Sequence, residues 1–265
     1  MRDDLTDIFI ADGDRNPLKS AQRDMKRPLP KRFYEQVAVQ PLDEGFGIAL
    51  DGKPVNTPAR ARMVLPTENL AEAVAEEWRA QGPEIDPAKM PKTRLVNTAL
   101  DGVAREKEAV AAEIAKFAGS DLICYRAAAP ESLIAEQDAA WNPILDFFRE
   151  KFSARFLCSQ GVIYVAQPPG SLEAIRRAVE RQAEGPDGAL RLAALNVLTT
   201  LTGSALIALA LVHGGLDFDS AWAAAHVDED HQMRFWGADG EALARREARK
   251  AEMRSALEVL AALDG

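Results

Sequence analysis

An uncharged stretch from Leu192 to Val212 constrains the fold of this chain more than any other segment. It is long enough to cross a lipid bilayer as a helix, which takes roughly 17 to 25 mainly apolar residues. However, it contains Asn196, Thr199 and Ser204 among other polar residues, and neither aromatic belts nor a basic cluster flank it. We therefore predict no membrane insertion. The expected structure is a helix over residues 190–213 that is hydrophobic on all sides and buried in a globular domain.

The composition is that of a globular chain with an acidic balance of charge. Hydrophobic residues make up 47% and charged residues 28% of the chain, values that exclude wholesale disorder. The 41 acidic residues outnumber the 32 basic ones, which gives a net charge of −9. Binding to nucleic acid of any sequence needs a basic surface, so we expect no nucleic-acid partner.

Few residues of the chain suit catalysis or metal binding. It has three histidines and two cysteines, without the Cys-x-x-Cys or Cys/His spacing that is typical of a metal site. It also lacks a glycine-rich phosphate-binding motif, so we expect neither a metal nor an organic cofactor. Cys124 and Cys158 are expected to be buried free thiols in a reducing compartment. A disulfide and a cysteine nucleophile are the alternatives.

Between residues 33 and 66, apolar and polar residues alternate with the period of two that is typical of β-strands. Residues 1–30 are polar and are expected to form a flexible arm. Asp51-Gly52 predicts a hairpin turn, and Thr67 is a good N-cap for a helix that ends near Gln81. The expected strands cover residues 33–39, 45–50, 53–57 and 63–65.

The remainder of the chain is predicted to be helical. Expected helices cover residues 93–118, 130–152 with a kink at Asn142-Pro143, 171–183, 190–213, 218–236 and 241–263, with a lone strand at 161–165. The fold class is therefore α+β. We expect a small N-terminal α/β domain with an antiparallel sheet over residues 31–119, and a larger, mainly α-helical domain over residues 120–265.

The candidate functional residues lie in the segment from Ala221 to Gly237. On one continuous helix, Trp222, Glu229 and Trp236 would share a face with Ala225 and Met233, because their spacing is three and four residues. This arrangement buries the Glu229 carboxylate in an aromatic stripe, where an unpaired charge costs several kcal/mol. The flanking polar residues would point elsewhere: Asp228, Asp230, His231 and Arg234.

Three interpretations of this carboxylate remain open from the residues alone. It could form a structural ion pair within the fold, or it could bind a partner protein. A metal site could instead use Asp228 and His231, with help from His226, but a carboxylate-bridged site needs a second such helix and the chain supplies none. Two turn-rich segments, residues 50–58 and 90–93, are either simple turns or the rim of a binding face.

Eight short segments occur in the order that is typical of one protein family. They are Lys31-Arg32-Phe33-Tyr34, Leu50–Pro58, Leu70-Ala71 with Glu76-Glu77-Trp78 and Gln81, Met90–Thr93, Thr98–Asp101, Asp121-Leu122 with Tyr125-Arg126, Trp141-Asn142-Pro143, and Asp228–Gln232 with Trp236-Gly237. On these segments the chain resembles the Atp12 family of F1-ATPase assembly chaperones, over residues 31–240.

The resemblance implies a chaperone without enzymatic activity. Such a protein binds the free α subunit of F1-ATPase and shields its β-facing surface before the α and β subunits pair. The acidic motif of the family falls on Asp228-Glu229-Asp230, and we expect Glu229, Asp228, Gln232, Trp236 and Trp222 to bind the partner. His231 departs from the family pattern, in which an aromatic residue is usual at this position.

The resemblance also bears on location and assembly. Mitochondrial relatives carry transit peptides, whereas the acidic N-terminus here does not look like one, so we expect a bacterial cytoplasmic protein. We expect it to be monomeric when free. Two other functions remain as alternatives: a metal-assisted hydrolase that uses Asp228, Glu229 and His231, and a general holdase without a fixed client.

Overall fold

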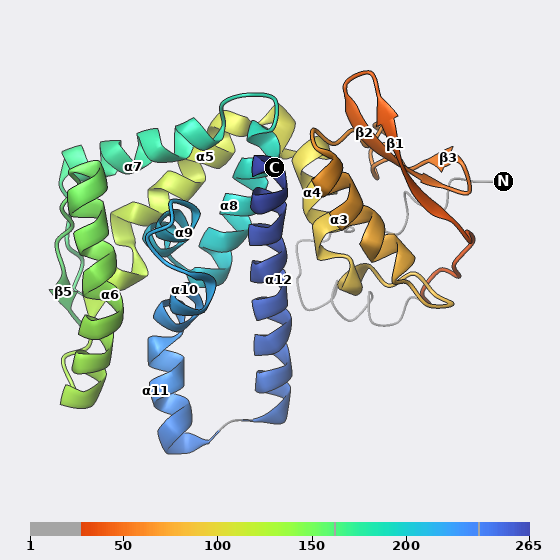
Figure 1. Ribbon diagram of the computed structural model, residues 1–265. Coiled ribbons are helices and arrows are strands. Elements are labelled where there is room, and N and C mark those ends of the chain that lie inside the picture. The colour runs from red at the N-terminus through yellow and green to blue at the C-terminus, as the bar shows by residue number, and fades with distance from the viewer. Residues whose placement is uncertain (1–27, 162, 238) are drawn as a thin grey trace. The chain divides into compact units, whose positions relative to one another are not determined.

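The structure, a computed structural model, describes residues 28–161, 163–237 and 239–265 (Figure 1). Most of the predicted arm, up to residue 27, therefore lies outside the described part. The chain divides into two compact units. The first contains the described residues up to Arg105 together with Val259–Gly265, and the second contains Glu106–Glu258. A small antiparallel sheet near the N-terminus and a mainly helical remainder confirm the predicted α+β class. The division into domains between residues 119 and 120 stays a prediction.

The sheet of the first unit is built from two tight hairpins. Strands β1 (Val37–Leu42), β2 (Gly45–Leu50) and β3 (Lys53–Pro54) pair antiparallel in that order. The predicted turn at Asp51-Gly52 is confirmed, and both residues have positive φ, 47° and 79°. Three expected strands differ: the first begins only at Val37, the third covers only Lys53–Pro54 of residues 53–57, and residues 63–65 contribute only an isolated bridge at Leu65.

Helices α3 (Glu68–Arg79) and α4 (Pro91–Asp101) also belong to this unit, and polar side chains cap their starts. Helix α3 begins after Thr67, whose side chain accepts a hydrogen bond from the Leu70 N–H at 3.2 Å, as predicted. Helix α4 begins where buried Glu77 accepts the N–H groups of Lys92 and Thr93, both at 2.8 Å. Glu77 therefore caps α4 from a neighbouring helix.

The turn-rich segments 50–58 and 90–93 use polar groups within the first unit. The Asp101 carboxylate accepts the Thr57 hydroxyl at 2.5 Å and the Ala59 N–H at 2.9 Å. The Asp51 carboxylate accepts the Gln36 N–H at 2.8 Å. Together with the bonds from the Lys92 and Thr93 N–H groups to Glu77, these contacts support the interpretation of both segments as simple turns.

The second unit is a helical body. Its helices are α5 (Lys107–Lys116), α6 (Glu131–Phe152), α7 (Pro169–Gln182), α8 (Gly188–Thr202), α9 (Ala205–Val212), α10 (Phe218–Ala225), α11 (Val227–Trp236) and the part of α12 (Gly240–Asp264) up to Glu258. The two-residue strands β4 (Tyr125–Arg126) and β5 (Ser159–Gln160) pair in parallel. The expected helix over residues 93–118 is instead two helices, because α4 ends at Asp101 and α5 begins at Lys107. The strand expected at 161–165 is also wrong, since β5 ends at Gln160.

The uncharged stretch forms two helices rather than one. Helix α8 ends at Gly203, whose φ of 67° is left-handed, and Ser204 caps the start of α9 with its side chain. All of α9 up to Leu211 is buried, as predicted, and α9 packs against α6, α8 and α10 (Figure 1). Among the described residues, none of the helices combines the length and hydropathy needed to cross a membrane.

A fully buried carboxylate holds the junction between α8 and α9. Asp121 accepts the Ser204 hydroxyl at 2.5 Å and the Leu206 N–H at 3.1 Å, so it neutralises donors at the N-terminus of α9. Its burial outweighs these hydrogen bonds and raises its pKa to about 6.

We predict that Asp121 makes the stability of the protein depend on pH. The folded carboxyl binds its proton more tightly than the unfolded one, so its contribution is full below about pH 4 and is lost as the pH rises through about 6. The raised pKa corresponds to about 3 kcal/mol. The free energy of unfolding of the wild type, minus that of Asp121→Asn, should fall by up to this amount between pH 4 and 7 in urea titrations. A difference that is constant or that grows with pH would contradict the assignment.

Candidate functional site

The segment that carries the candidate residues is broken at His226. This residue lies outside both flanking helices, with φ −123° and ψ 18°. Its Nδ1 lies 2.8 Å from the Trp222 carbonyl oxygen, and its ring contacts the Trp222 ring at a tilt of 32°, with centroids 3.8 Å apart. Because a carbonyl oxygen only accepts, Nδ1 carries the proton. The prediction of one continuous helix over residues 218–236 is therefore wrong.

The break separates the two tryptophans that were expected to share a face. Trp222 on α10 is buried, whereas Trp236 at the end of α11 is 88% exposed. Glu229 is also placed differently from the prediction, because its side chain is 56% exposed and not buried in an aromatic stripe. A change of backbone direction at His226 cancels the three-and-four spacing on which both expectations depended.

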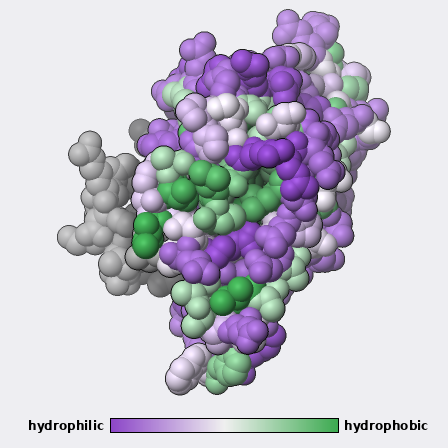
Figure 2. All heavy atoms as spheres, turned by 90° about the vertical axis from the view of Figure 1, so that its left-hand side faces the viewer, coloured by the Kyte–Doolittle hydropathy of each residue, from purple (hydrophilic) through white to green (hydrophobic). Residues whose placement is uncertain are grey.

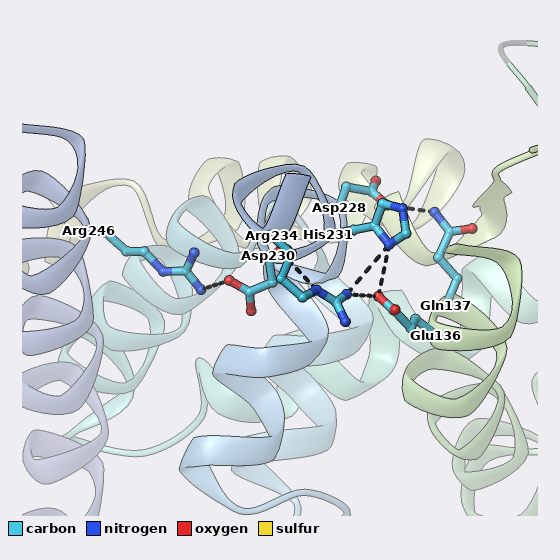
Figure 3. A network of polar contacts seen from close by, with 7 residues as sticks. All are labelled: Glu136, Gln137, Asp228, Asp230, His231, Arg234 and Arg246. Carbon is cyan, nitrogen blue, oxygen red and sulfur yellow. Dashed lines mark hydrogen bonds and ion pairs between the residues drawn. The ribbon is translucent and has the colours of Figure 1, made fainter. Parts of the chain in front are cut away.

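One side of α11 is joined to α6 by polar side chains (Figure 3). Gln137 Nε2 donates to the Asp228 carboxylate at 2.7 Å, and Gln137 Oε1 accepts the Ala127 N–H at 2.8 Å. Farther along α11, Nδ1 of buried His231 lies 3.3 Å from Glu136 Oε2. Arg234 contacts the same Glu136 oxygen and holds the pKa of that carboxyl below its usual range.

Another side of α11 is joined to α12. Asp230 forms an ion pair with Arg246 of α12, as Figure 3 shows. The Arg246 side chain is only 17% exposed, and its guanidinium lies over the Trp222 ring, 5.8 Å from the centroid. Helix α11 is therefore held on both sides by side-chain contacts, which we call the α11 network: Glu136, Gln137, Asp228, Asp230, His231, Arg234 and Arg246.

The remaining surface of α11 is exposed. We call it the α11 outer face and define it by Glu229, Gln232, Phe235 and Trp236. Glu229 lies 4.0 Å from His226 Nε2, but burial lowers the pKa of His226, so this imidazole is neutral near pH 7. The outer face thus combines two exposed aromatic rings with a carboxylate that His226 does not neutralise.

The three residues of the acidic motif Asp228-Glu229-Asp230 make different contacts: Asp228 bonds α6, Asp230 pairs with α12, and Glu229 is exposed. All three residues lie in the first turn of α11, where negative charge interacts favourably with the helix dipole. Asp228 and Asp230 belong to the α11 network, whereas Glu229 lies on the outer face. The geometry therefore gives no support to a metal site of Asp228, Glu229 and His231. No three His, Cys, Asp or Glu side chains come together as metal ligands in the described part of the chain.

Sequence reasoning missed several exposed hydrophobic residues. Phe235 is 69% exposed beside Trp236, and Leu243 near the start of α12 is 44% exposed. Figure 2 shows further hydrophobic side chains gathered on the side of the second unit that carries α6 and β5. Around β5, Ile163 is 71% and Tyr164 69% exposed. The only sign of exposed rings in the sequence is the apolar pair Phe235-Trp236 directly before Gly237, and such a pair is equally typical of a strand and of a helix end.

Comparison with known proteins places the chain in a family. A sequence model described as ATP12 chaperone protein matches residues 31–149. The crystal structure of Atp12 from Paracoccus denitrificans is 38% identical, with a TM-score of 0.79, over 88% of this chain and 98% of that chain. The chain belongs to the ATP12 chaperone family. Its resemblance to that family in the sequence is thereby confirmed.

Two further solved structures are similar to this chain, one of them over nearly its whole length. The Atu1473 protein from Agrobacterium tumefaciens is 44% identical, with a TM-score of 0.86, over 98% of this chain and 96% of that one. An aspartate-to-lysine mutant of the Paracoccus protein is 36% identical, with a TM-score of 0.80, over 88% and 97%. The ATP12 sequence model ends before α11, so the roles of the residues on the outer face stay a prediction.

We predict that Gln137 contributes to stability through the α11 network. Gln137→Leu removes the partners of the Ala127 N–H and of the Asp228 carboxylate, which should lower the free energy of unfolding by about 1–3 kcal/mol in urea titrations. The matched control is Gln232→Leu on the exposed outer face, which should change it by less than about 0.5 kcal/mol. Equal effects of the two substitutions would show that the network does not hold α11.

Proposed function

We propose that this ATP12-family chaperone assists assembly of the F1 sector of ATP synthase by binding the free α subunit through the α11 outer face. It would shield the surface that α later presents to β, act by binding without catalysis, and work as a monomer in a bacterial cytoplasm. The observation that carries the proposal is Trp236, 88% exposed at the end of a helix that side chains hold on two sides. Family membership supports the role in assembly.

An exposed tryptophan on a fixed helix suits protein recognition. Aromatic side chains bury a large area with few rotatable bonds, and Trp is enriched among the residues that dominate binding energy. Phe235 adds a second ring beside it. Because the α11 network already holds the backbone that presents both rings, little conformational entropy is lost on binding.

The charge of the outer face indicates what the client presents to it. Glu229 offers an exposed carboxylate one helical turn from Gln232 and about two turns from Trp236. A guanidinium can pair with a carboxylate and stack on an aromatic ring at the same time, so an arginine of the α subunit fits this face better than a lysine. The net charge of −9 would assist the encounter with such a basic surface.

The proposal is tested by binding to isolated F1 subunits. Immobilised wild-type chain should retain the α subunit and not the β subunit. Glu229→Lys and Trp236→Ala should each weaken α binding at least about tenfold, which is about 1.4 kcal/mol. Trp236 is exposed, so Trp236→Ala should change the free energy of unfolding by less than about 0.5 kcal/mol. Glu229→Lys should lower it by about 1 kcal/mol, because it reverses a charge in the first turn of α11, and this small loss leaves the protein folded.

The control keeps the charge change and moves it to another place. Glu184→Lys alters an exposed residue just after α7 and should leave α binding unchanged. Wild-type affinity in the Glu229 and Trp236 variants would contradict the outer face as the binding surface. Equal retention of α and β would contradict the proposed client.

A general holdase is separated from this role by client range. The wild type should suppress aggregation of free α subunit at a one-to-one ratio and leave aggregation of reduced insulin unchanged. Suppression of both would favour the holdase. The hydrolase alternative has no support from the positions of Asp228, Glu229 and His231, which make separate contacts.

A further inference from the structure

The two cysteines of the chain flank the only strand pairing described in the second unit. In the parallel pair of β4 and β5, Tyr125 is opposite Ser159 and Arg126 is opposite Gln160. Cys124 ends a 3-10 turn (Leu122–Cys124) directly before β4, and Cys158 directly precedes β5, so each cysteine is bonded to a residue of the first strand pair. Neighbouring strands lie about 4.8 Å apart, and disulfides join Cα atoms about 4.4–6.8 Å apart. Residues that directly precede two paired strands start from this spacing, and we infer that the cysteines come within the range that a disulfide can bridge.

The environment of the thiols differs, although they influence each other. Cys124 is buried and Cys158 is exposed, and both are free thiols in this structure. Burial raises the pKa of the Cys124 thiol, and negative charge on Asp121 and on Cys158 raises it further. Cys158 is close enough to act on Cys124 electrostatically, which agrees with the register. Cys158 is also the thiol that an oxidant can reach first.

We propose that Cys124 and Cys158 are a redox-active pair that closes into a reversible intrachain disulfide when the protein meets a small disulfide oxidant. With oxidised glutathione, the Cys158 thiolate attacks one sulfur and releases one glutathione, which leaves a mixed disulfide. Cys124 then loses its proton to solvent, attacks the Cys158 sulfur and releases the second glutathione. Two protein thiols are oxidised, and the oxidant gains two electrons and two protons to become two glutathione thiols.

The position of the bond gives it a consequence. It would join the segments that precede and follow α6, the helix whose Glu136 and Gln137 hold α11. Hydrogen bonds already hold the segment after α6 in place. Gln167 Oε1 accepts the Leu157 N–H at 2.8 Å, and Gln167 Nε2 donates to the Leu157 carbonyl oxygen at 2.9 Å. A cross-link there restricts the unfolded chain, so the oxidised protein should melt at a higher temperature than the reduced one. In a reducing cytoplasm such a bond is transient and responds to oxidants.

The test is intact-mass analysis of the full chain after treatment with oxidised glutathione. The wild type should lose the mass of two hydrogens, and a proteolytic map should join the peptides that contain Cys124 and Cys158. Cys124→Ala should stop at one added glutathione on Cys158. Cys158→Ser should stay unmodified, because Cys124 is buried. Closure of the wild type should be faster at higher pH, since Cys124 must lose its proton.

Three results would overturn the proposal. They are a wild type that keeps the glutathione as Cys124→Ala does, a disulfide between two copies of the chain, and no reaction at either cysteine. Circular dichroism shows whether Cys124→Ala folds; if it does not, the wild-type peptide map and the exposed Cys158→Ser variant still decide. A closed disulfide that leaves the melting temperature unchanged would refute the proposed restraint around α6.

Discussion

Burial of the uncharged stretch as α8 and α9 is the constraint on which the second unit depends. A chain cannot reverse inside a core unless the free N–H groups at the new helix start find acceptors, and Asp121 with Ser204 supplies them. Once α9 is placed, α6, α8 and α10 pack against it and cover its apolar surface. The position of α6 then determines where Glu136 and Gln137 contact α11.

Helix α11 depends on polar contacts more than on the core. Only Val227 and His231 are buried along it, and contacts to α6 and α12 hold it in place. This arrangement leaves an outer face free to carry Phe235 and Trp236 in water, although their burial would be favourable. The proposed binding of a client requires such a face, because its position is fixed before binding and its aromatic rings are free to be buried.

The sequence predicts what local rules decide and fails where a single side chain overrides periodicity. Thr67, Asp51-Gly52 and the α+β class follow from capping, turn chemistry and hydrophobic period. The break at His226 does not, because its imidazole bonds the Trp222 carbonyl oxygen across the helix junction. Because the sequence does not reveal this break, buried Trp222 was wrongly predicted to lie on the same face as the exposed residues of α11. Glu229, Gln232 and Trp236 do lie together, since they share α11.

Photo-crosslinking from position 236 tests most directly whether the α11 outer face binds the α subunit. The photoreactive amino acid benzoylphenylalanine would replace Trp236, which is exposed enough to accept it, with the same residue at Glu184 as the reference. The account predicts a cross-link from position 236 to free α subunit, which disappears when β subunit is added before irradiation. Equal cross-linking from both positions, or a cross-link at 236 that β does not compete away, would contradict it.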